Sequence, residues 1–163
     1  MLTFKEQAEV CRIGLIIELL TQQEVVRWAD NIIGTDDHPD YAVVDISLTG
    51  NSGLPSLVSL LFEIAGDANS DKVINTVLGL CSERLNRGVF DANKSIAVLS
   101  RLVPESSCRR CSIMAEYEIC IKTQTADMIR TVLDRSDSDV VNTIHAFLMP
   151  YSGYAQEITL ESI

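Results

Sequence analysis

Residues 3–24 read TFKEQAEVCRIGLIIELLTQQE, and their apolar side chains recur every three or four positions. That spacing is the period of an α-helix, whereas a strand would alternate at every second residue. Thr3 with Glu6, and Thr21 with Glu24, each match the capping box that begins a helix. The stretch therefore predicts one helix that ends before Thr21 and a second that begins there. The apolar stripe of the first helix runs through Phe4, Ala8, Cys11, Leu15 and Leu19.

Further helices follow along the chain, separated by polar or glycine-containing turns. Gly34 is the expected end of the second helix, and Pro39 suits the first turn of the next one. Residues 43–48 could also form a strand, but a lone strand would have nothing to pair with, so a helix is preferred. The later helices are expected at residues 40–49, 54–65, 71–87, 92–103, 106–122, 125–133 and 139–148.

The chain thus predicts an all-α fold in a single domain, residues 1–163, with about eight helices. These would form stacked helical hairpins or an irregular bundle. A chain of 163 residues is long enough for an ordinary core, and 47% hydrophobic residues exclude a largely disordered protein. The tail, residues 151–163, has no clear helical pattern and is expected to be extended or loosely ordered.

A faint internal similarity links two parts of the chain at an offset of 70 residues. Both parts contain a helix, a tight turn with a capping residue, and a second helix, as stacked helical hairpins do. Two unrelated amphipathic hairpins with similar turns would align equally well, so both interpretations stay open. The aligned pairs are Leu15/Leu85, Leu20/Phe90, Thr21/Asp91, Val26/Ile96, Ala29/Leu99, Ile32/Leu102 and Ile33/Val103.

The protein is acidic, with 23 Asp and Glu against 13 Lys and Arg and a formal charge of −10. The charge is uneven: residues 1–80 hold 12 acidic and 4 basic side chains, residues 81–111 hold 3 and 6, and residues 112–163 hold 8 and 3. Such a surface favours a cationic partner and repels phosphates, so we expect a protein partner and no nucleic acid.

The densest acidic cluster is the stretch 36–40, Asp-Asp-His-Pro-Asp, and Asp45 follows closely. Asp36, Asp37, Asp40 and Asp45 are our candidates for partner-binding residues. A calcium loop would need alternating ligands, a central glycine and a terminal glutamate, which are missing. The alternative is a polar turn whose aspartates cap helices.

Five cysteines, an odd number, argue for a reducing compartment, and we expect Cys11, Cys81 and Cys120 to be buried. The pair Cys108 and Cys111 could be a redox pair, half of a zinc site, or two cysteines at a helix start. A zinc site needs four ligands, and no second C-x-x-C is present. The sequence therefore predicts no metal and no cofactor.

Catalytic motifs are missing, so we expect no enzyme activity. No phosphate-binding glycine loop, nucleophile elbow or Glu-x-x-His pair is present. His38 is expected in a solvated loop, His145 half-buried on the last helix, and Trp28 in the core. With no signal peptide and no stretch of about 20 apolar residues, the protein is expected to be cytoplasmic and without a membrane contact.

Residues 15–33 (LIIELLTQQEVVRWADNII), followed by His38-Pro39 and by residues 44–48 (VDISL), resemble small all-helical bacterial immunity proteins. These accompany the toxins of contact-dependent growth inhibition and other polymorphic toxin systems. The resemblance covers about the first third of the chain and assigns no binding residues. It implies an immunity protein that neutralises a cognate, basic, nuclease-type toxin by direct binding. The alternative is a helical adaptor or regulatory scaffold for an endogenous protein.

Overall fold

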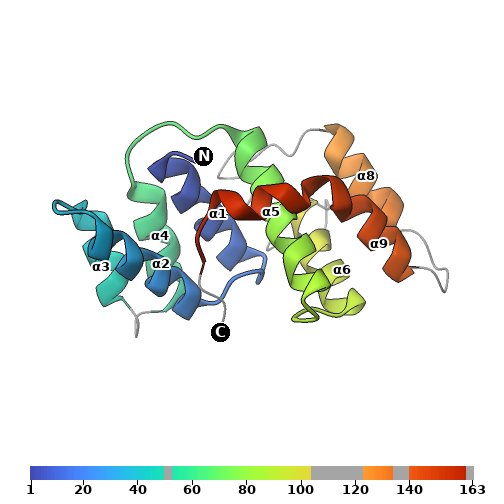
Figure 1. Ribbon diagram of the computed structural model, residues 1–163, viewed down its shortest axis with the longest axis horizontal. Coiled ribbons are helices and arrows are strands. Elements are labelled where there is room, and N and C mark those ends of the chain that lie inside the picture. Colours follow the sequence, from blue (N-terminus) through green and yellow to red (C-terminus); the bar gives the residue numbers. More distant parts are fainter. Residues whose placement is uncertain (50–52, 104–122, 134–139, 161–163) are drawn as a thin grey trace. The chain divides into compact units, whose positions relative to one another are not determined.

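The protein is all-α throughout the residues that the computed structural model describes, which are 1–49, 53–103, 123–133 and 140–160. Eight α-helices and one 3-10 helix are present there, with no strand, which confirms the predicted fold class (Figure 1). The predicted helix over 106–122 lies outside the described residues. The helices are α1 (Phe4–Ile16), α2 (Gln22–Thr35), α3 (Tyr41–Leu48), α4 (Leu54–Glu63), α5 (Ser70–Asn86), α6 (Ala92–Leu102), α8 (Thr123–Leu133), α9 (Val140–Leu148) and the 3-10 helix η1 (Met149–Glu157).

The chain divides into two compact units. Unit 1 consists of Met1–Asn69 together with Gln156–Ile163, and unit 2 consists of Ser70–Ala155. Helices α1 to α4 belong to unit 1, and α5, α6, α8 and α9 belong to unit 2. The expected single domain over residues 1–163 stays a prediction.

Three helix contacts recur among the described residues of the two units. In unit 1, α3 packs against α2 and α4, and α4 packs against α1. In unit 2, α8 packs against α6 and α9, and α9 packs against α5. Of the helices that the structure describes, α1 and α4 thus pair as α5 and α9 do, α2 and α3 as α6 and α8, and α3 and α4 as α8 and α9. Helix α6 also contacts α5 and α9, and unit 1 shows no comparable packing of α2 on α1 or α4.

Helix α1 ends earlier than its apolar stripe predicted, at Ile16 rather than near Leu20. Glu18 takes the left-handed conformation, with φ of 61°. The backbone N–H groups of Leu19 and Leu20 then both donate to the carbonyl of Gly14, at 2.8 and 2.9 Å. Both leucines remain buried. The apolar stripe therefore identified the buried residues correctly. Leu19 and Leu20 nevertheless lie in the turn, because a left-handed residue folds the chain back over the end of the helix.

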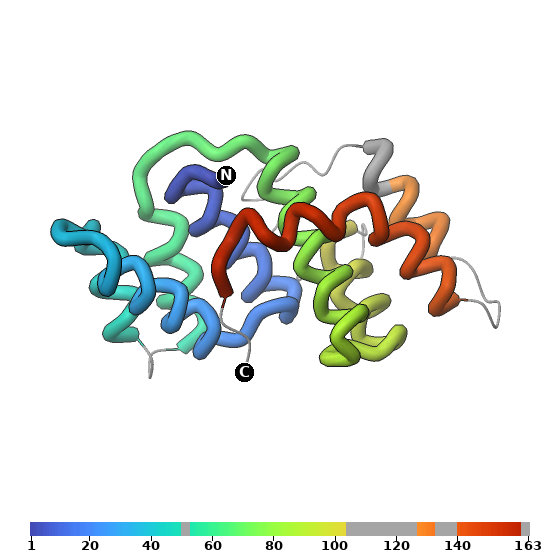
Figure 2. The backbone as a smooth tube through the Cα atoms, viewed as in Figure 1, coloured from blue at the N-terminus to red at the C-terminus, as the bar shows by residue number. Residues whose placement is uncertain are grey.

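The same turn joins α5 to α6 (Figure 2). Gly88 has a φ of 71°. The N–H groups of Val89 and Phe90 both donate to the carbonyl of Arg84, at 3.0 and 3.1 Å. The internal similarity seen in the sequence is thus also a similarity of local backbone structure.

Helix α2 passes through Gly34 and ends at Thr35, so Gly34 is not its end as expected. The Thr35 hydroxyl donates to the carbonyls of Asn31 and Ile32, at 3.0 and 3.2 Å. The Ile32 carbonyl also accepts the Asp36 N–H at 2.9 Å, so the hydroxyl adds a side-chain bond to the last turn of the helix. Asp36 follows in an extended conformation and closes the helix.

The tail is more ordered than its sequence suggested. Residues 149–157 form η1, where an extended or loose chain was expected from residue 151. Gly79 on α5 explains this: a Cβ there would lie 2.7 Å from the Ala155 nitrogen and 2.7 Å from the Tyr151 carbonyl oxygen. The missing side chain lets the backbone of η1 lie directly on α5, a contact between distant residues that periodicity does not reveal.

Candidate protein-binding face

Of the four aspartates proposed from the sequence, Asp36, Asp37 and Asp40 lie between α2 and α3 in unit 1 and Asp45 lies within α3, and all four are exposed. Ser47 on α3 donates a hydrogen bond to Asp30 on α2, which ties the two helices together. Figure 1 shows α2 and α3 side by side, joined by the short loop that contains the acidic cluster.

Two of these aspartates have structural roles. The Asp36 carboxylate accepts a hydrogen bond from the His38 N–H at 2.9 Å and shapes the loop. The Asp40 carboxylate accepts one from the Ala42 N–H at 2.9 Å and caps α3. The alternative interpretation, a polar turn with capping aspartates, is therefore correct for this pair.

The other two, Asp37 and Asp45, have carboxylates with no hydrogen-bond or ion-pair partner among the described residues. Asp45 contributes only its main-chain carbonyl, which accepts from the Thr49 hydroxyl. Neither carboxylate is paired within the part of the chain that the structure describes, so both can interact with a cation from outside the protein.

The exposed side of α3 also carries two large side chains that sequence reasoning missed. Tyr41 is 88% exposed and Leu48 is 78% exposed. Because residues four and seven positions apart share one face of a helix, Tyr41, Asp45 and Leu48 form a single stripe. Val43 and Ile46, on the opposite side, are fully buried. Together Asp30, Asp36, Asp37, Asp40, Tyr41, Asp45 and Leu48 are called the acidic face below.

A signal for Tyr41 and Leu48 was present in the composition of α3. Six of its eight residues, YAVVDISL, are apolar or aromatic. A short helix on the surface buries only one of its sides, which contains about half of its residues. Some of these side chains therefore had to face solvent, and only the packing of α3 decided which ones.

The acidic face lies in a long stretch without cations. Residues 28–70 contain seven Asp and Glu and no Lys or Arg. Unit 1 as a whole holds 13 acidic and 3 basic residues, a formal charge of −10, whereas unit 2 holds 10 of each. The entire net charge of the protein therefore belongs to unit 1.

Two of the three cations of unit 1 are turned inward. Lys5 lies 2.9 Å from a Glu9 carboxylate oxygen, and Arg12 donates to Glu9 through Nε at 2.8 Å. Both cations also lie over the ring of Phe62, 5.5 and 5.7 Å from its centroid. This cluster joins α1 to α4, so these cations do not neutralise the acidic face.

The histidines lie as the sequence predicted, with His38 exposed and His145 half-buried on α9. Trp28 is 2% exposed, which confirms its place in the core. Cys11 and Cys81 are buried as expected, and burial raises the pKa of the Cys81 thiol to about 12. Burial also raises the pKa of Cys11, with a smaller contribution from Glu24. Neither thiol is a nucleophile near neutral pH. Cys108, Cys111 and Cys120 lie outside the described residues.

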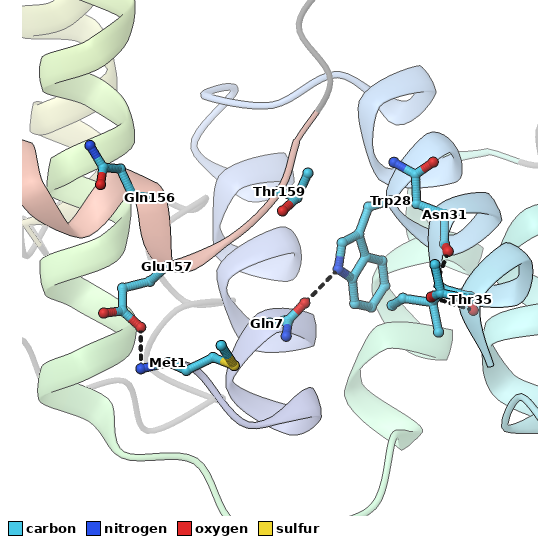
Figure 3. Close-up of a pocket in the computed structure, with 9 residues that line it drawn as sticks. Met1, Gln7, Trp28, Asn31, Thr35, Gln156, Glu157 and Thr159 are labelled. Atoms are coloured by element: carbon cyan, nitrogen blue, oxygen red, sulfur yellow. Dashed lines mark hydrogen bonds and ion pairs between the residues drawn. The ribbon is translucent and has the colours of Figure 1, made fainter.

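Unit 1 also contains a pocket of about 620 Å³ beside Trp28 (Figure 3). The indole of Trp28 stacks on Phe4, with ring centroids 5.8 Å apart, and its Nε1 donates to Gln7 at 3.1 Å. On the opposite side the Met1 amino group pairs with Glu157 at 2.6 Å. All the lining residues belong to unit 1: Met1, Gln7, Trp28, Asn31, Ile32, Thr35, Gln156, Glu157 and Thr159.

The described residues offer neither a metal cluster nor a membrane span. No three His, Cys, Asp or Glu side chains among them come close enough to hold a metal ion. This includes the loop of Asp36, Asp37 and Asp40. Within the same residues, no helix combines the length and apolarity needed to cross a bilayer.

Comparison with protein-family models, with characterised proteins and with solved structures finds no match.

Proposed function

We propose that the protein is a non-catalytic protein-binding protein whose acidic face docks onto a basic partner. The observation that carries this proposal is the combination of exposed carboxylates, above all Asp37 and Asp45, with the exposed Tyr41, within a stretch of sequence, residues 28–70, that contains no Lys or Arg. A field of one sign accelerates the encounter with a partner of the opposite sign and selects against others. An exposed tyrosine supplies the large, rigid contact area typical of binding hot spots.

The partner we propose is a nuclease-type bacterial toxin domain, which this protein would neutralise as an immunity protein. A nuclease cleft is basic because it binds phosphates, and it therefore attracts a surface of clustered carboxylates. Blocking such a cleft requires affinity and charge complementarity, and no catalytic group on the inhibitor. The resemblance of residues 15–33 to immunity proteins supports the same partner class.

The test is binding to, and protection against, the product of the gene next to this one, which the proposal expects to contain a toxin domain. We expect the purified proteins to form a complex and co-expression to rescue growth. We expect Tyr41→Ala to weaken binding by roughly thirtyfold, which corresponds to about 2 kcal/mol. Tyr154→Ala in unit 2, where Tyr154 is 39% exposed, is the matched control and should leave the affinity unchanged.

The electrostatic contribution of the acidic face to association is tested with a separate control. Asp37→Asn with Asp45→Asn should slow association and flatten its salt dependence. Glu83→Gln with Asp127→Asn changes the net charge equally but in unit 2, where these residues form exposed pairs with Arg87 and Arg130. If both pairs of substitutions alter association equally, or if neither does, the acidic face is not the docking surface.

A second candidate is an adaptor or regulatory scaffold for an endogenous protein. The turn and the three helix contacts that the two units share favour it, because tandem helical units commonly serve as scaffolds for binding. The neighbouring gene product separates the two candidates. An adaptor would neither bind that product nor protect cells against it, and its own partner would still require Tyr41.

A further inference from the structure

The exposed stripe of α3 places an aromatic ring and a carboxylate one helical turn apart. Tyr41 and Asp45 are four positions apart on this helix, a spacing that puts two Cβ atoms about 5–6 Å from each other. The Cα–Cβ bonds of a helix tilt toward its N-terminus, which directs the Asp45 side chain toward the turn that begins at Tyr41. The two side chains therefore lie close enough to contact one group of a partner together.

Neither side chain is engaged within the part of the protein that the structure describes. Tyr41 is 88% exposed, and its ring and hydroxyl contact no aromatic ring, cation or hydrogen-bonding group there. The Asp45 carboxylate is likewise exposed and unpaired among these residues. With 13 acidic and 3 basic residues in unit 1, the surroundings of this pair complement a cation.

A guanidinium group fits this pair better than an ammonium group does. The guanidinium is planar, so one of its faces can stack on the Tyr41 ring while N–H groups at its edge donate to the Asp45 carboxylate. An ammonium group is a strongly hydrated point charge, so it must lose more water before it contacts a ring. Arginine is accordingly the more frequent cation over aromatic rings in proteins.

Leu48 extends the same stripe by one further turn and is 78% exposed. An arginine places the methylene groups of its stem on apolar surface while its charged end pairs elsewhere. Along α3 the stripe thus offers an apolar side chain, a carboxylate and a ring, in the order in which the stem and the guanidinium of one arginine would meet them.

We propose that the stripe of α3 recognises an arginine side chain of the partner. Its guanidinium stacks on Tyr41 and donates to Asp45, and its stem lies toward Leu48. This inference rests on the proposed docking function and adds the chemical group that the partner must supply. Asp37 and Asp40 attract a cation of either kind, whereas the Tyr41 and Asp45 pair selects arginine over lysine.

Two peptides of equal charge separate the guanidinium from the charge that it carries. The probes are hexaarginine and hexalysine, each with blocked ends and a fluorescent label, and anisotropy measures their binding to the full chain at low salt. Hexaarginine should bind roughly two- to fivefold more tightly, which is the effect of one exposed cation–π contact. Nuclear magnetic resonance of the isotope-labelled chain should show the largest hexaarginine-induced changes at residues 41–48.

Substitutions on the acidic face test each part of the pair. Tyr41→Leu should reduce the affinity for hexaarginine to that for hexalysine, whereas Tyr41→Phe keeps the ring and should keep the preference. Asp45→Asn should weaken both peptides and lower the preference. Asp37→Asn, the matched change of one charge, should weaken both peptides by the same factor. Tyr154→Leu in unit 2 should leave both affinities unchanged, and circular dichroism shows whether each variant keeps its fold.

Four outcomes overturn the arginine site: binding of neither peptide, equal affinity for both, a preference that survives Tyr41→Leu, and equal loss of preference in Asp37→Asn and Asp45→Asn. In each case, a complex with the neighbouring gene product that requires the acidic face would still support the proposed function. Conversely, an arginine preference that Tyr41→Leu abolishes, without any such complex, would reject the toxin partner and retain the arginine site.

Discussion

Glu18 and Gly88 occupy equivalent positions 70 residues apart, and each ends the first helix of its unit in the left-handed conformation, with φ of 61° and 71°. After each of them, the next two N–H groups donate to one carbonyl, that of Gly14 in unit 1 and of Arg84 in unit 2. Thr21 and Asp91 then cap the second helix through Glu24 and Lys94. Together with the three helix contacts that recur in both units, this favours a true internal repeat over two unrelated hairpins.

The two units use charge differently despite this common local structure. The buried Glu6, Glu9 and Arg12 of α1 correspond at the same offset to Thr76, Gly79 and Ser82 of α5. Unit 1 thus contains a buried charged cluster and the whole net charge, whereas unit 2 has small residues at these positions. Removal of side-chain bulk at residue 79 allows η1 to pack on α5.

The turn at Gly88 predicts that alanine substitution changes the free energy of unfolding in opposite directions at Gly88 and Gly34. An alanine methyl group at Gly88 or at Gly34 would have no atom within 4 Å, so sterics do not distinguish the two positions. Gly88→Ala should lower the free energy of unfolding by about 1 kcal/mol, because an alanine resists the left-handed conformation. Gly34→Ala, inside α2, should raise it by about 0.5–1 kcal/mol. Chemical denaturation measures both, and equal signs would contradict this account of the turn.

The contact of Gly79 with η1 predicts a larger loss. Gly79→Ala should lower the free energy of unfolding by about 1–3 kcal/mol, because the added methyl group would overlap backbone atoms of Tyr151 and Ala155, which cannot rotate away. Gly153→Ala within η1 meets no atom within 4 Å and is the control. Hydrogen exchange of the η1 amides should accelerate in Gly79→Ala alone. Unchanged exchange would show that η1 does not depend on this glycine.

The capping role of Asp40 can be separated from its charge. Asp40→Ala should lower the free energy of unfolding by about 1 kcal/mol through loss of the α3 cap, whereas Asp40→Asn should keep the cap. Asp37→Asn and Asp45→Asn should change stability by less than about 0.5 kcal/mol. Thermal unfolding compares the four variants. A large loss in Asp37→Asn or Asp45→Asn would mean that these carboxylates serve the fold instead of a partner.

The two buried thiols predict a loss of stability at alkaline pH. In the unfolded chain a thiol loses its proton near pH 8.5, whereas burial raises the pKa of Cys81 to about 12 and also raises that of Cys11. Above about pH 9 the folded state therefore binds more protons than the unfolded state. Each thiol should lower the free energy of unfolding by about 1.4 kcal/mol per pH unit there.

Urea unfolding as a function of pH tests this effect, with Cys81→Ala as the comparison. Above about pH 9 the free energy of unfolding should fall more steeply for the wild-type protein than for Cys81→Ala. The two slopes should differ by the effect of one proton, about 1.4 kcal/mol per pH unit. Below that pH the two curves should run parallel. Identical slopes throughout would show that Cys81 titrates normally in the folded state.

Local sequence patterns predicted most helices well, because their signals act over a few residues. The capping boxes at Thr3 and Thr21 begin α1 and α2 as expected, and α3 is a helix and not a strand. The end of α1 was placed too late because Leu19 and Leu20 continue the apolar stripe although they lie in the turn. Periodicity reports which residues are buried and does not distinguish a helix from a turn folded back upon it.

The sequence by itself determined the all-α fold, the acidity and the position of the acidic cluster, since periodicity, caps and charge are properties of neighbouring residues. The hydrogen bonds of Asp36 and Asp40 are local as well, each to a backbone N–H two residues further on, whereas the tertiary structure leaves Asp37 and Asp45 exposed without a partner among the described residues. It also decided that Tyr41 is exposed and that Lys5 and Arg12 are held inside by Glu9. These outcomes depend on which helices pack together, because contacts between distant residues determine which charges remain at the surface.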